Sequence, residues 1–324
     1  MLELQTKVGI SGYVKKVEAI HADTGVRRIL YEGGPNQILL SGMQPLGDRG
    51  DWMNYCQVGT SDAAVSNLNT SLQGWVAGTN TVFLTTTGAQ STPPYYGWKQ
   101  KIFRFPILTG TNQNLNEVGV GWDDGRPGFT DTLLSRALIV DILGVRSTPT
   151  WVVGEYLDVT YELRYYPPLI DVTGNVTING LGFDYILRAL AVTSTSAWGT
   201  NIGSLIGQYS LFASDWSAYD GAIGAITASV PSGIAAACDN ANQYNFAVGS
   251  PDYTQGIGVD CGLSGWNLVA GLRCIKIATT AGYYQLQLTA DGTGGGILGD
   301  PLWKTAGFHI AARMHLTWAE GTIP

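Results

Sequence analysis

The stretch "LDVTYELRYYP", residues 157–167, alternates between two kinds of side chain. Its odd-numbered positions hold Leu157, Val159, Tyr161, Leu163 and Tyr165, and its even-numbered positions hold Asp158, Thr160, Glu162, Arg164 and Tyr166. Because successive side chains of a strand point to opposite faces of a sheet, this alternation predicts a β-strand with one face in a core. We expect the face with Asp158, Glu162 and Arg164 to be solvated or to lie between subunits, and not to be a catalytic row.

Strand patterns of this kind recur along the chain. Residues 13–32 read as two strands around the turn "ADTG", since Asp and Gly tolerate the backbone angles of a tight reversal. Strand-like runs follow at "YGWKQKIFRFPI" (96–107), "LNEVGVGW" (115–122) and "LLSRALIVD" (133–141). A spacing of roughly 10 residues between strands, with turn signals in between, is typical of antiparallel sandwiches. The sequence therefore predicts an all-β fold.

Pro167-Pro168 marks the expected boundary between two domains, because proline cannot donate to a sheet ladder and ends a strand. We expect an N-terminal β-sandwich domain with a leading hairpin at residues 1–167, and a C-terminal β-sandwich domain at 168–324. The final strand pattern, "FHIAARMHLTW" at 308–318, repeats the alternation at the matching end of its domain. An internal duplication would explain this repeat, and it requires the same strand order in both halves.

Composition narrows the choice of partners. Of the 324 residues, 13% are charged and 43 are glycine, and the net charge is −7. With so few charges, repulsion between copies of the chain is weak, and we expect much of the surface to be buried between copies. The sequence has no basic stripe that would bind nucleic acid, and no apolar run reaches the ~18–20 residues of a membrane span. The first residues lack a signal-peptide pattern, which predicts synthesis in the cytoplasm.

Residue types that often carry catalysis or bind metals are scarce. The chain has three histidines, of which His309 and His315 would lie ~20 Å apart along one strand, too far to share a metal. His21 stands beside the first turn without a visible partner. The cysteines are Cys56, Cys238, Cys261 and Cys274. They form no Cys-x-x-Cys pair, so we expect free buried thiols and no structural zinc.

Three motifs have the spacing of catalytic sequences without their context. Asp123-Asp124 would point opposite ways on an extended chain, so we interpret "DDGRPG" as a turn and not as a glycosidase pair. "GLSGW" (262–266) has nucleophile-elbow spacing around Ser264 but no strand-turn-helix setting. "DGTGGGILGDPLWKT" (291–305) lacks the end of a phosphate-binding loop, which favours a hairpin or a subunit-contact loop. We predict no catalytic residue, no metal and no cofactor.

Aromatic loops in the second half are the remaining candidates for a site. Trp198, Trp216, Tyr219 and Tyr253 stand beside Gly, Ser and Asp, as in loops that bind sugars or proteins, because rigid rings lose little entropy on binding. We take these four residues as candidate contacts with a receptor or partner. The alternative is that the rings fill the core or the contacts within a trimer.

Taken in the order "NYCQVGTS" (54–61), "WKQKIFRFP" (98–106), "LNEVGVGW", "LLSRALIV" and "LDVTYELRYYPP", the chain resembles tail and baseplate structural proteins of long-tailed bacteriophages. "DVTGNVTINGLGFDYILRALAVTS" (171–194) is similar to the start of that family's second domain, and the resemblance covers residues 36–193. It implies a non-enzymatic part of the virion, oligomeric and often threefold, made in the host cytoplasm without a signal. No site residue comes with it.

We therefore expect a structural virion protein of a phage tail tip or baseplate that assembles as a homo-oligomer, a trimer by the resemblance, and contributes to host attachment. Its expected partners are copies of itself, other tail or baseplate proteins and a bacterial surface receptor, without nucleic acid or membrane insertion. Two alternatives stay open. One is a carbohydrate-binding, lectin-like module or tail-fibre receptor binder, and the other is a polysaccharide depolymerase, for which the sequence offers no usefully spaced carboxylates.

Overall fold

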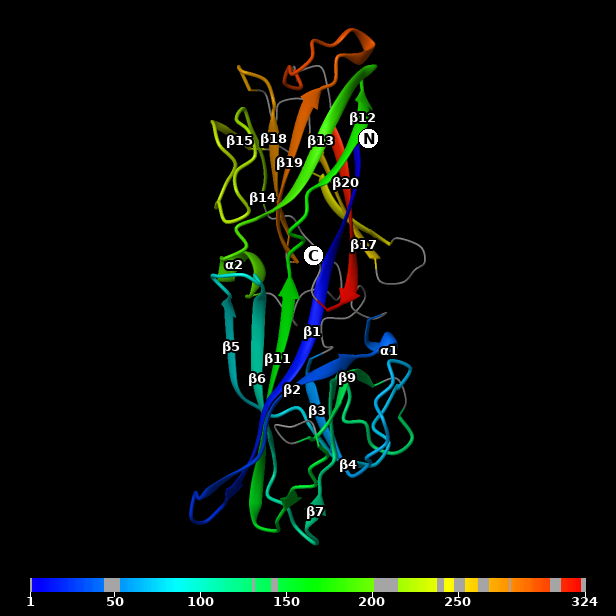
Figure 1. The fold of residues 1–324 in the computed structure, drawn as a ribbon, viewed down its shortest axis with the longest axis vertical. Helices are drawn as coiled ribbons and strands as arrows, with labels where there is room; N and C mark the ends of the chain where they lie inside the picture. The colour runs from blue at the N-terminus through cyan, green and yellow to red at the C-terminus, as the bar shows by residue number, and fades with distance from the viewer. Residues whose placement is uncertain are drawn as a thin grey trace.

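The protein, seen in a computed structural model, is an elongated molecule of two lobes, drawn in Figure 1 with its long axis vertical. The structure describes residues 2–43, 53–129, 132–140, 145–200, 215–237, 242–247, 254–261, 268–279, 281–303 and 310–321. In these residues the strands form a 12-stranded sheet, a six-stranded sheet and a two-stranded pair, and every helix is a single short turn. The predicted all-β fold with antiparallel sheets is confirmed.

The first strand is the spine of the molecule. β1 (Leu2–His21) runs through both lobes, as the blue arrow in Figure 1 shows. Its second half forms the predicted hairpin with β2 (Arg27–Ile38) and pairs along its other edge with β11 (Glu155–Tyr166), antiparallel in both cases. β11 contains the alternating stretch and lies between β1 and β6, so that stretch is a central strand of the sheet.

The first half of the chain builds the lower lobe around this hairpin. The sheet continues from β2 through β9, β8, β3 and β4, and from β11 through β6 and β5. Besides β1, β2 and β11, the elements of this lobe are α1 (Leu40–Met43), β3 (Tyr55–Gly59), β4 (Trp75–Thr79), β5 (Val82–Ala89), β6 (Gly97–Phe105), β7 (Gln113–Asn114), β8 (Glu117–Gly121), β9 (Leu133–Leu138) and β10 (Thr150–Trp151).

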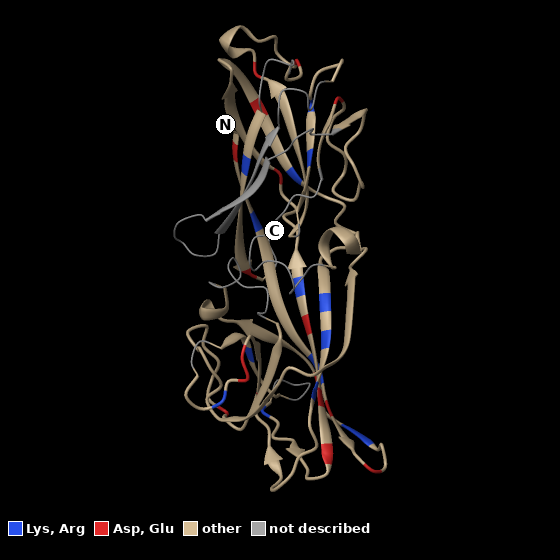
Figure 2. Cartoon of the chain, turned by 180° about the vertical axis from the view of Figure 1, so that it is seen from behind, with Lys and Arg blue, Asp and Glu red and all other residues tan. Residues whose placement is uncertain are grey.

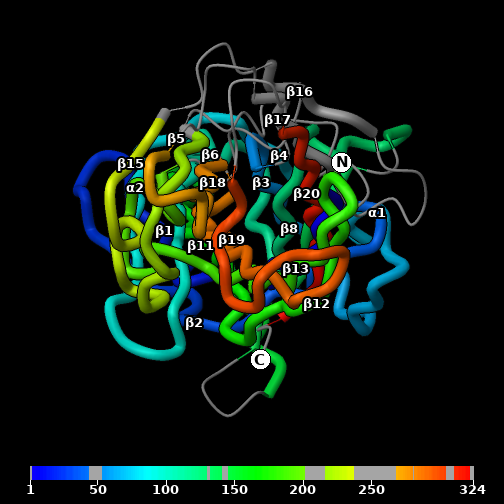
Figure 3. The backbone as a smooth tube through the Cα atoms, turned by 90° about the horizontal axis from the view of Figure 1, so that it is seen from above, coloured from blue at the N-terminus to red at the C-terminus, as the bar shows by residue number. Residues whose placement is uncertain are grey.

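The second half builds most of the upper lobe. Its six-stranded sheet has the order β12-β13-β19-β18-β14-β15, and β16, β17 and β20 extend the long sheet. In the view from above, β13, β18 and β19 stand across the lobe from β17 and β20 (Figure 3). The elements are β12 (Val172–Ile178), β13 (Leu181–Leu190), α2 (Thr195–Trp198), β14 (Asp215–Tyr219), β15 (Ala235–Ala237), β16 (Asn242–Ala247), β17 (Thr254–Cys261), β18 (Cys274–Thr279), β19 (Gly282–Ala290), η2 (Thr293–Gly295) and β20 (Ile310–Glu320).

Residues 2–10 belong to the upper lobe. β20 lies parallel to the first half of β1, with Leu4 opposite Met314 and Ile10 opposite Glu320. The side chain of Gln37 in β2 donates to the Glu320 carboxylate at 2.6 Å, so β20 continues along the edge of β1 that β2 occupies lower down. The interval 168–324 therefore lacks one strand of the lobe that it otherwise forms.

The predicted duplication is wrong, because the two halves have different strand orders. β11, which ends the first half, is antiparallel to β1 and lies between β1 and β6. β20, which ends the second half, is parallel to β1 and lies outside the six-stranded sheet. The two strands share their alternation because each has a face in the core, and this requires no common origin.

One apolar core extends through both lobes, and it includes Val14, Phe103, Leu286 and Met314. At the junction, the ring of Trp198 lies edge-on to Tyr284 with centroids 5.6 Å apart, and its indole nitrogen donates to the Leu190 carbonyl at 2.9 Å. The backbone of Trp198 presses on Gly97 of β6, where a Cβ atom would collide with the Trp198 carbonyl. This close approach joins the upper lobe to a strand of the lower lobe.

Candidate functional site

The polar side of β11 forms one surface with the neighbouring strands β6 and β1. Figure 2 shows charged residues in line along strands of the lower lobe. Asp158 lies opposite Arg104 of β6 and Glu18 of β1, yet Asp158 is only 5% exposed. Longer side chains cover the carboxylates, so the solvated alternative is wrong for Asp158 and Glu162, and a position between subunits stays a prediction. We name this surface the arginine–aromatic face; it comprises Tyr13, Phe83, Tyr96, Arg104, Tyr156, Asp158, Glu162 and Arg164.

Arg104 is the centre of the lower part of the arginine–aromatic face. Its guanidinium donates to both carboxylate oxygens of Asp158, at 2.8 and 2.7 Å, and these hydrogen bonds raise the pKa of Arg104. The Phe83 ring lies 3.9 Å from the same guanidinium and the Tyr156 ring lies 5.6 Å from it. A planar cation that is held at its edge and stacked on its face is fixed in orientation.

Arg164 repeats the arrangement in the upper part of the face. It donates to Glu162 at 2.6 Å and lies between the rings of Tyr13, 3.8 Å away, and Tyr96, 4.5 Å away. Tyr96 in turn contacts Tyr166, with ring centroids 5.5 Å apart. Each carboxylate of the face is thus occupied by an arginine, and what remains for a ligand is a set of rings around fixed positive charges.

Sequence reasoning missed this face because its residues come from separate segments. Tyr13 lies on β1, Phe83 on β5 and Tyr156 on β11, while Tyr96 immediately precedes β6. The available signal was the even-numbered parity of residues 156–166 together with the parity of β6, and pairing the two required the register of the strands.

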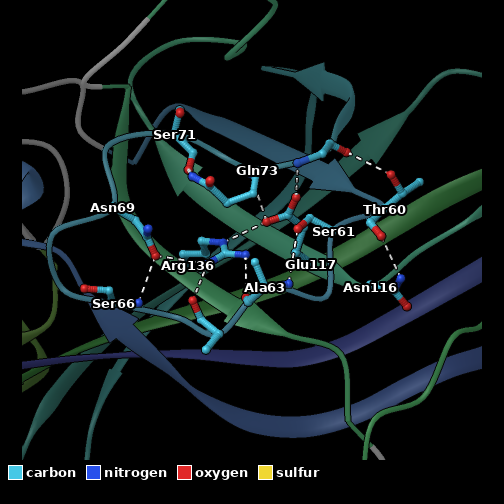
Figure 4. Close-up of polar contacts among 12 residues, drawn as sticks. Thr60, Ser61, Ala63, Ser66, Asn69, Ser71, Gln73, Asn116, Glu117 and Arg136 are labelled. Atoms are coloured by element: carbon cyan, nitrogen blue, oxygen red, sulfur yellow. Dashed lines mark hydrogen bonds and ion pairs between the residues drawn. The ribbon is translucent and has the colours of Figure 1, made fainter.

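A second polar cluster lies inside the lower lobe, where Glu117 of β8 and Arg136 of β9 form a fully buried ion pair of 2.7 Å (Figure 4). Glu117 accepts the backbone N–H groups of Gln73 and Gly74, at 3.2 and 2.6 Å. Arg136 donates to the Asn69 side chain at 3.0 Å, and to the carbonyl oxygens of Ala63 at 3.0 Å and Ala64 at 3.3 Å. The long loop 60–74 is therefore wrapped around a buried charge pair.

The loop 291–303 lies at the upper end of the molecule (Figure 1), and it exposes several apolar side chains. We name Val269, Ile297, Leu298 and Trp303 the apex patch; they are 100%, 70%, 75% and 56% exposed. Ile297, Leu298 and Trp303 lie on one loop, and backbone hydrogen bonds between Leu272 and Leu302 bring the segment of Val269 beside it. Large apolar side chains that are this exposed are typical of contact surfaces.

Hydrogen bonds hold the apex loop in one conformation. The amide and hydroxyl groups of Thr293 donate to Asp291 at 2.8 and 2.7 Å and lower the pKa of that carboxyl. Arg273 donates to the Gly299 carbonyl at 3.1 Å, and Leu272 and Leu302 exchange backbone hydrogen bonds of 2.8 Å. The segments that carry the apex patch are therefore ordered by hydrogen bonds. The sequence motif was interpreted as a hairpin or subunit-contact loop, and its contact role stays a prediction.

The aromatic residues chosen from the sequence lie elsewhere. Trp198 and Trp216 are each 2% exposed and Tyr219 is 6% exposed, so these three rings fill the core and do not offer a contact surface. Their neighbours Gly, Ser and Asp suggested loops, but Trp216 and Tyr219 lie on β14 and Trp198 ends α2. Tyr253 lies outside the described residues, as do His309 and Ser264.

The structure also bears on the predicted turn at Asp123-Asp124 and on the cysteines. The side chains of Asp123 and Asp124 accept the backbone N–H groups of Gly125 and Arg126, at 3.3 and 3.2 Å, which confirms the turn. Cys56 and Cys274 are buried free thiols, as expected, and burial raises the pKa of Cys274 to about 12. Among the described residues, no helix is long and apolar enough to cross a membrane.

Comparison of the chain with protein-family models, with curated proteins and with solved structures finds no match.

Proposed function

We propose that the protein is a structural component of a phage tail tip or baseplate, which assembles with copies of itself and contributes to host attachment. The observation that carries this proposal is the apex patch, an exposed apolar surface at one end of an elongated β-body. An attachment protein needs a shaft and a distal contact surface, and β1 runs as one continuous strand from Leu2 to His21 through both lobes.

The energetics favour a contact role for the apex patch. A fully exposed Ile or Leu side chain gains roughly 1.5–3 kcal/mol when it is buried. Ile297 and Leu298 remain exposed on a loop that is held by the Asp291–Thr293 and Arg273–Gly299 hydrogen bonds. Because the loop is already ordered, binding would lose little conformational entropy.

The test uses particles that carry Leu298→Ser, with Leu68→Ser as the matched control. Both leucines are highly exposed, at 75% and 72%, but Leu68 lies on the loop of the lower lobe. We expect both variants to be incorporated into virions, and we expect Leu298→Ser particles alone to adsorb to host cells more slowly. The absence of the wild-type protein from purified virions would overturn the proposal.

A second candidate function is carbohydrate binding, which the arginine–aromatic face favours. Sugars stack on exposed rings and accept hydrogen bonds from fixed arginines. Phe83 is 58% exposed and lies beside Arg104, so the face combines an exposed ring with a fixed arginine. Saturable glycan binding by the intact protein that is lost in Phe83→Ala, and unchanged in Leu298→Ser, would favour this function over the first.

A further inference from the structure

β5 lies at an open edge of the long sheet. Among the described strands it pairs only with β6, so one side of its backbone has no neighbouring strand. An edge of this kind offers a row of N–H and C=O groups to another strand. The exposed residues at its start are Val82, Phe83 and Leu84, at 37%, 58% and 48%.

The start of β5 is apolar on both faces of the sheet. Leu84 lies opposite Ile102 and Val82 lies opposite Phe103, two adjacent residues of β6 that point to opposite faces. In a monomer, one face of an edge strand is expected to be polar.

Few of the usual protections of an edge strand are present. Edges are normally guarded by lysines, prolines or bulges. The segment 82–92, "VFLTTTGAQST", contains no charged residue and no proline. A bulge between Val82 and Leu84 is the single such device in this segment, and the six residues after it are regularly paired with β6.

We propose that β5 pairs with β5 of a second copy of this chain, antiparallel about a twofold axis. An uncharged strand can be placed beside itself without like charges meeting, and Thr85, Thr86 and Thr87 are β-branched residues that suit a pleated sheet. The sheet would then run β11-β6-β5-β5-β6-β11 across the two copies. With the twofold axis close to Leu84, the exposed Phe83 and Leu84 of both copies would become neighbours.

β12, the open edge of the six-stranded sheet, is a poorer candidate for such a contact. It also carries no charge, but the residues it exposes are Thr173, Asn175 and Thr177, which are polar. The apolar exposure on β5 is what distinguishes the two edges, because burying it favours association. β12 therefore supplies the control.

This inference rests on the proposed homo-oligomer and refines it. A twofold contact is isologous, so the number of copies joined through it is even. At this surface, we therefore expect a contact between two copies of the chain and not a threefold contact.

The first experiment measures the mass of the intact protein by light scattering over a dilution series, for wild type, Leu84→Lys and Thr177→Lys. We expect wild type and Thr177→Lys to contain an even number of copies. Lysines that face each other across the axis should raise the dissociation constant of Leu84→Lys roughly 100-fold or more, so that its mass falls by half.

The second experiment places single cysteines at Leu84, Thr85 and Thr86. In a twofold antiparallel pair one residue lies opposite its own copy, at a Cα separation that a disulfide can bridge. We expect one of the three variants to form a dimer under mild oxidation, and Thr177→Cys to form none.

The outcomes separate this contact from the wider proposal. A wild-type monomer would overturn both the homo-oligomer and the β5 contact. An oligomer that survives Leu84→Lys, or that cross-links through Thr177→Cys and not through β5, would overturn the β5 contact alone. Slower adsorption of Leu298→Ser particles would be unaffected by either result.

Discussion

Replacing Arg136 with methionine is the sharpest test of how the lower lobe holds its long loop. The substitution keeps an unbranched side chain but removes the guanidinium that contacts Glu117, Asn69 and the backbone of residues 63–64. Glu117 would stay buried, with the N–H groups of Gln73 and Gly74 as its remaining donors. Breaking a buried ion pair by removing one partner costs about 3–5 kcal/mol, because it leaves an uncompensated buried charge.

The expected cost lies in the lower half of that range. Two backbone donors continue to stabilise the Glu117 carboxylate, and Ala63 and Ala64 are exposed, so water can replace arginine at their carbonyl groups. We therefore expect Arg136→Met to lower the free energy of unfolding by about 3–4 kcal/mol. In Glu117→Met/Arg136→Met no lone charge remains, so the double variant should recover at least about 2 kcal/mol relative to the sum of the single substitutions.

Arg146→Met is the matched control, because Arg146 also contacts this loop. Its ion pair with Asp62 spans 2.9 Å, but the two side chains are 54% and 71% exposed. An exposed pair contributes about 0–1 kcal/mol, so this variant should resemble wild type.

Urea unfolding followed by tryptophan fluorescence gives the free energies, and hydrogen exchange of peptides from 60–74 locates the effect. Faster exchange in that loop is expected for Arg136→Met alone. The reasoning would be refuted if Arg136→Met cost less than 1 kcal/mol, or no more than Arg146→Met.

Three further predictions concern titration, the junction and the spine. Burial, followed by repulsion from Lys99, lowers the pKa of Lys101 from 10.5 to about 8. Between these pH values the unfolded chain binds more protons than the native one. The free energy of unfolding of wild type should therefore rise with pH relative to that of Lys101→Met, by at most about 3 kcal/mol. A difference in free energy, measured by urea unfolding, that does not change with pH would contradict this. Gly97→Ala should destabilise both lobes together, since its Cβ would collide with the Trp198 carbonyl, and calorimetry that shows an unchanged melting temperature would disprove the contact. Deleting residues 1–10 should expose one edge of β20 and speed its hydrogen exchange, while the β1–β11 pairing from Ser11 onward remains. Equal exchange would contradict the assigned strand pairing.

The local pattern was sufficient to predict β11 but insufficient to predict the surface that β11 forms. The alternation at 157–167 correctly predicted β11 and its core side with Val159 and Tyr161. It could not predict that Asp158 and Glu162 are also buried, because Arg104 and Tyr13, which help to cover them, come from distant segments. For the same reason, neighbouring Gly, Ser and Asp residues did not distinguish the buried rings of Trp198 and Trp216 from an exposed ring such as Phe83.

The sequence by itself determined several of the strands, the first hairpin and the all-β class, because side-chain alternation and turn residues act on neighbouring positions. Only the tertiary structure decided that β1 serves both lobes and that Leu4 pairs with Met314, about 300 residues further along the chain. Sheet pairing uses backbone groups that nearly all residues share, so the hydrogen bonds themselves do not name a partner strand. The choice of partner depends on how the whole core packs, and the same packing that buries Trp198 leaves Phe83 and Leu298 at the surface.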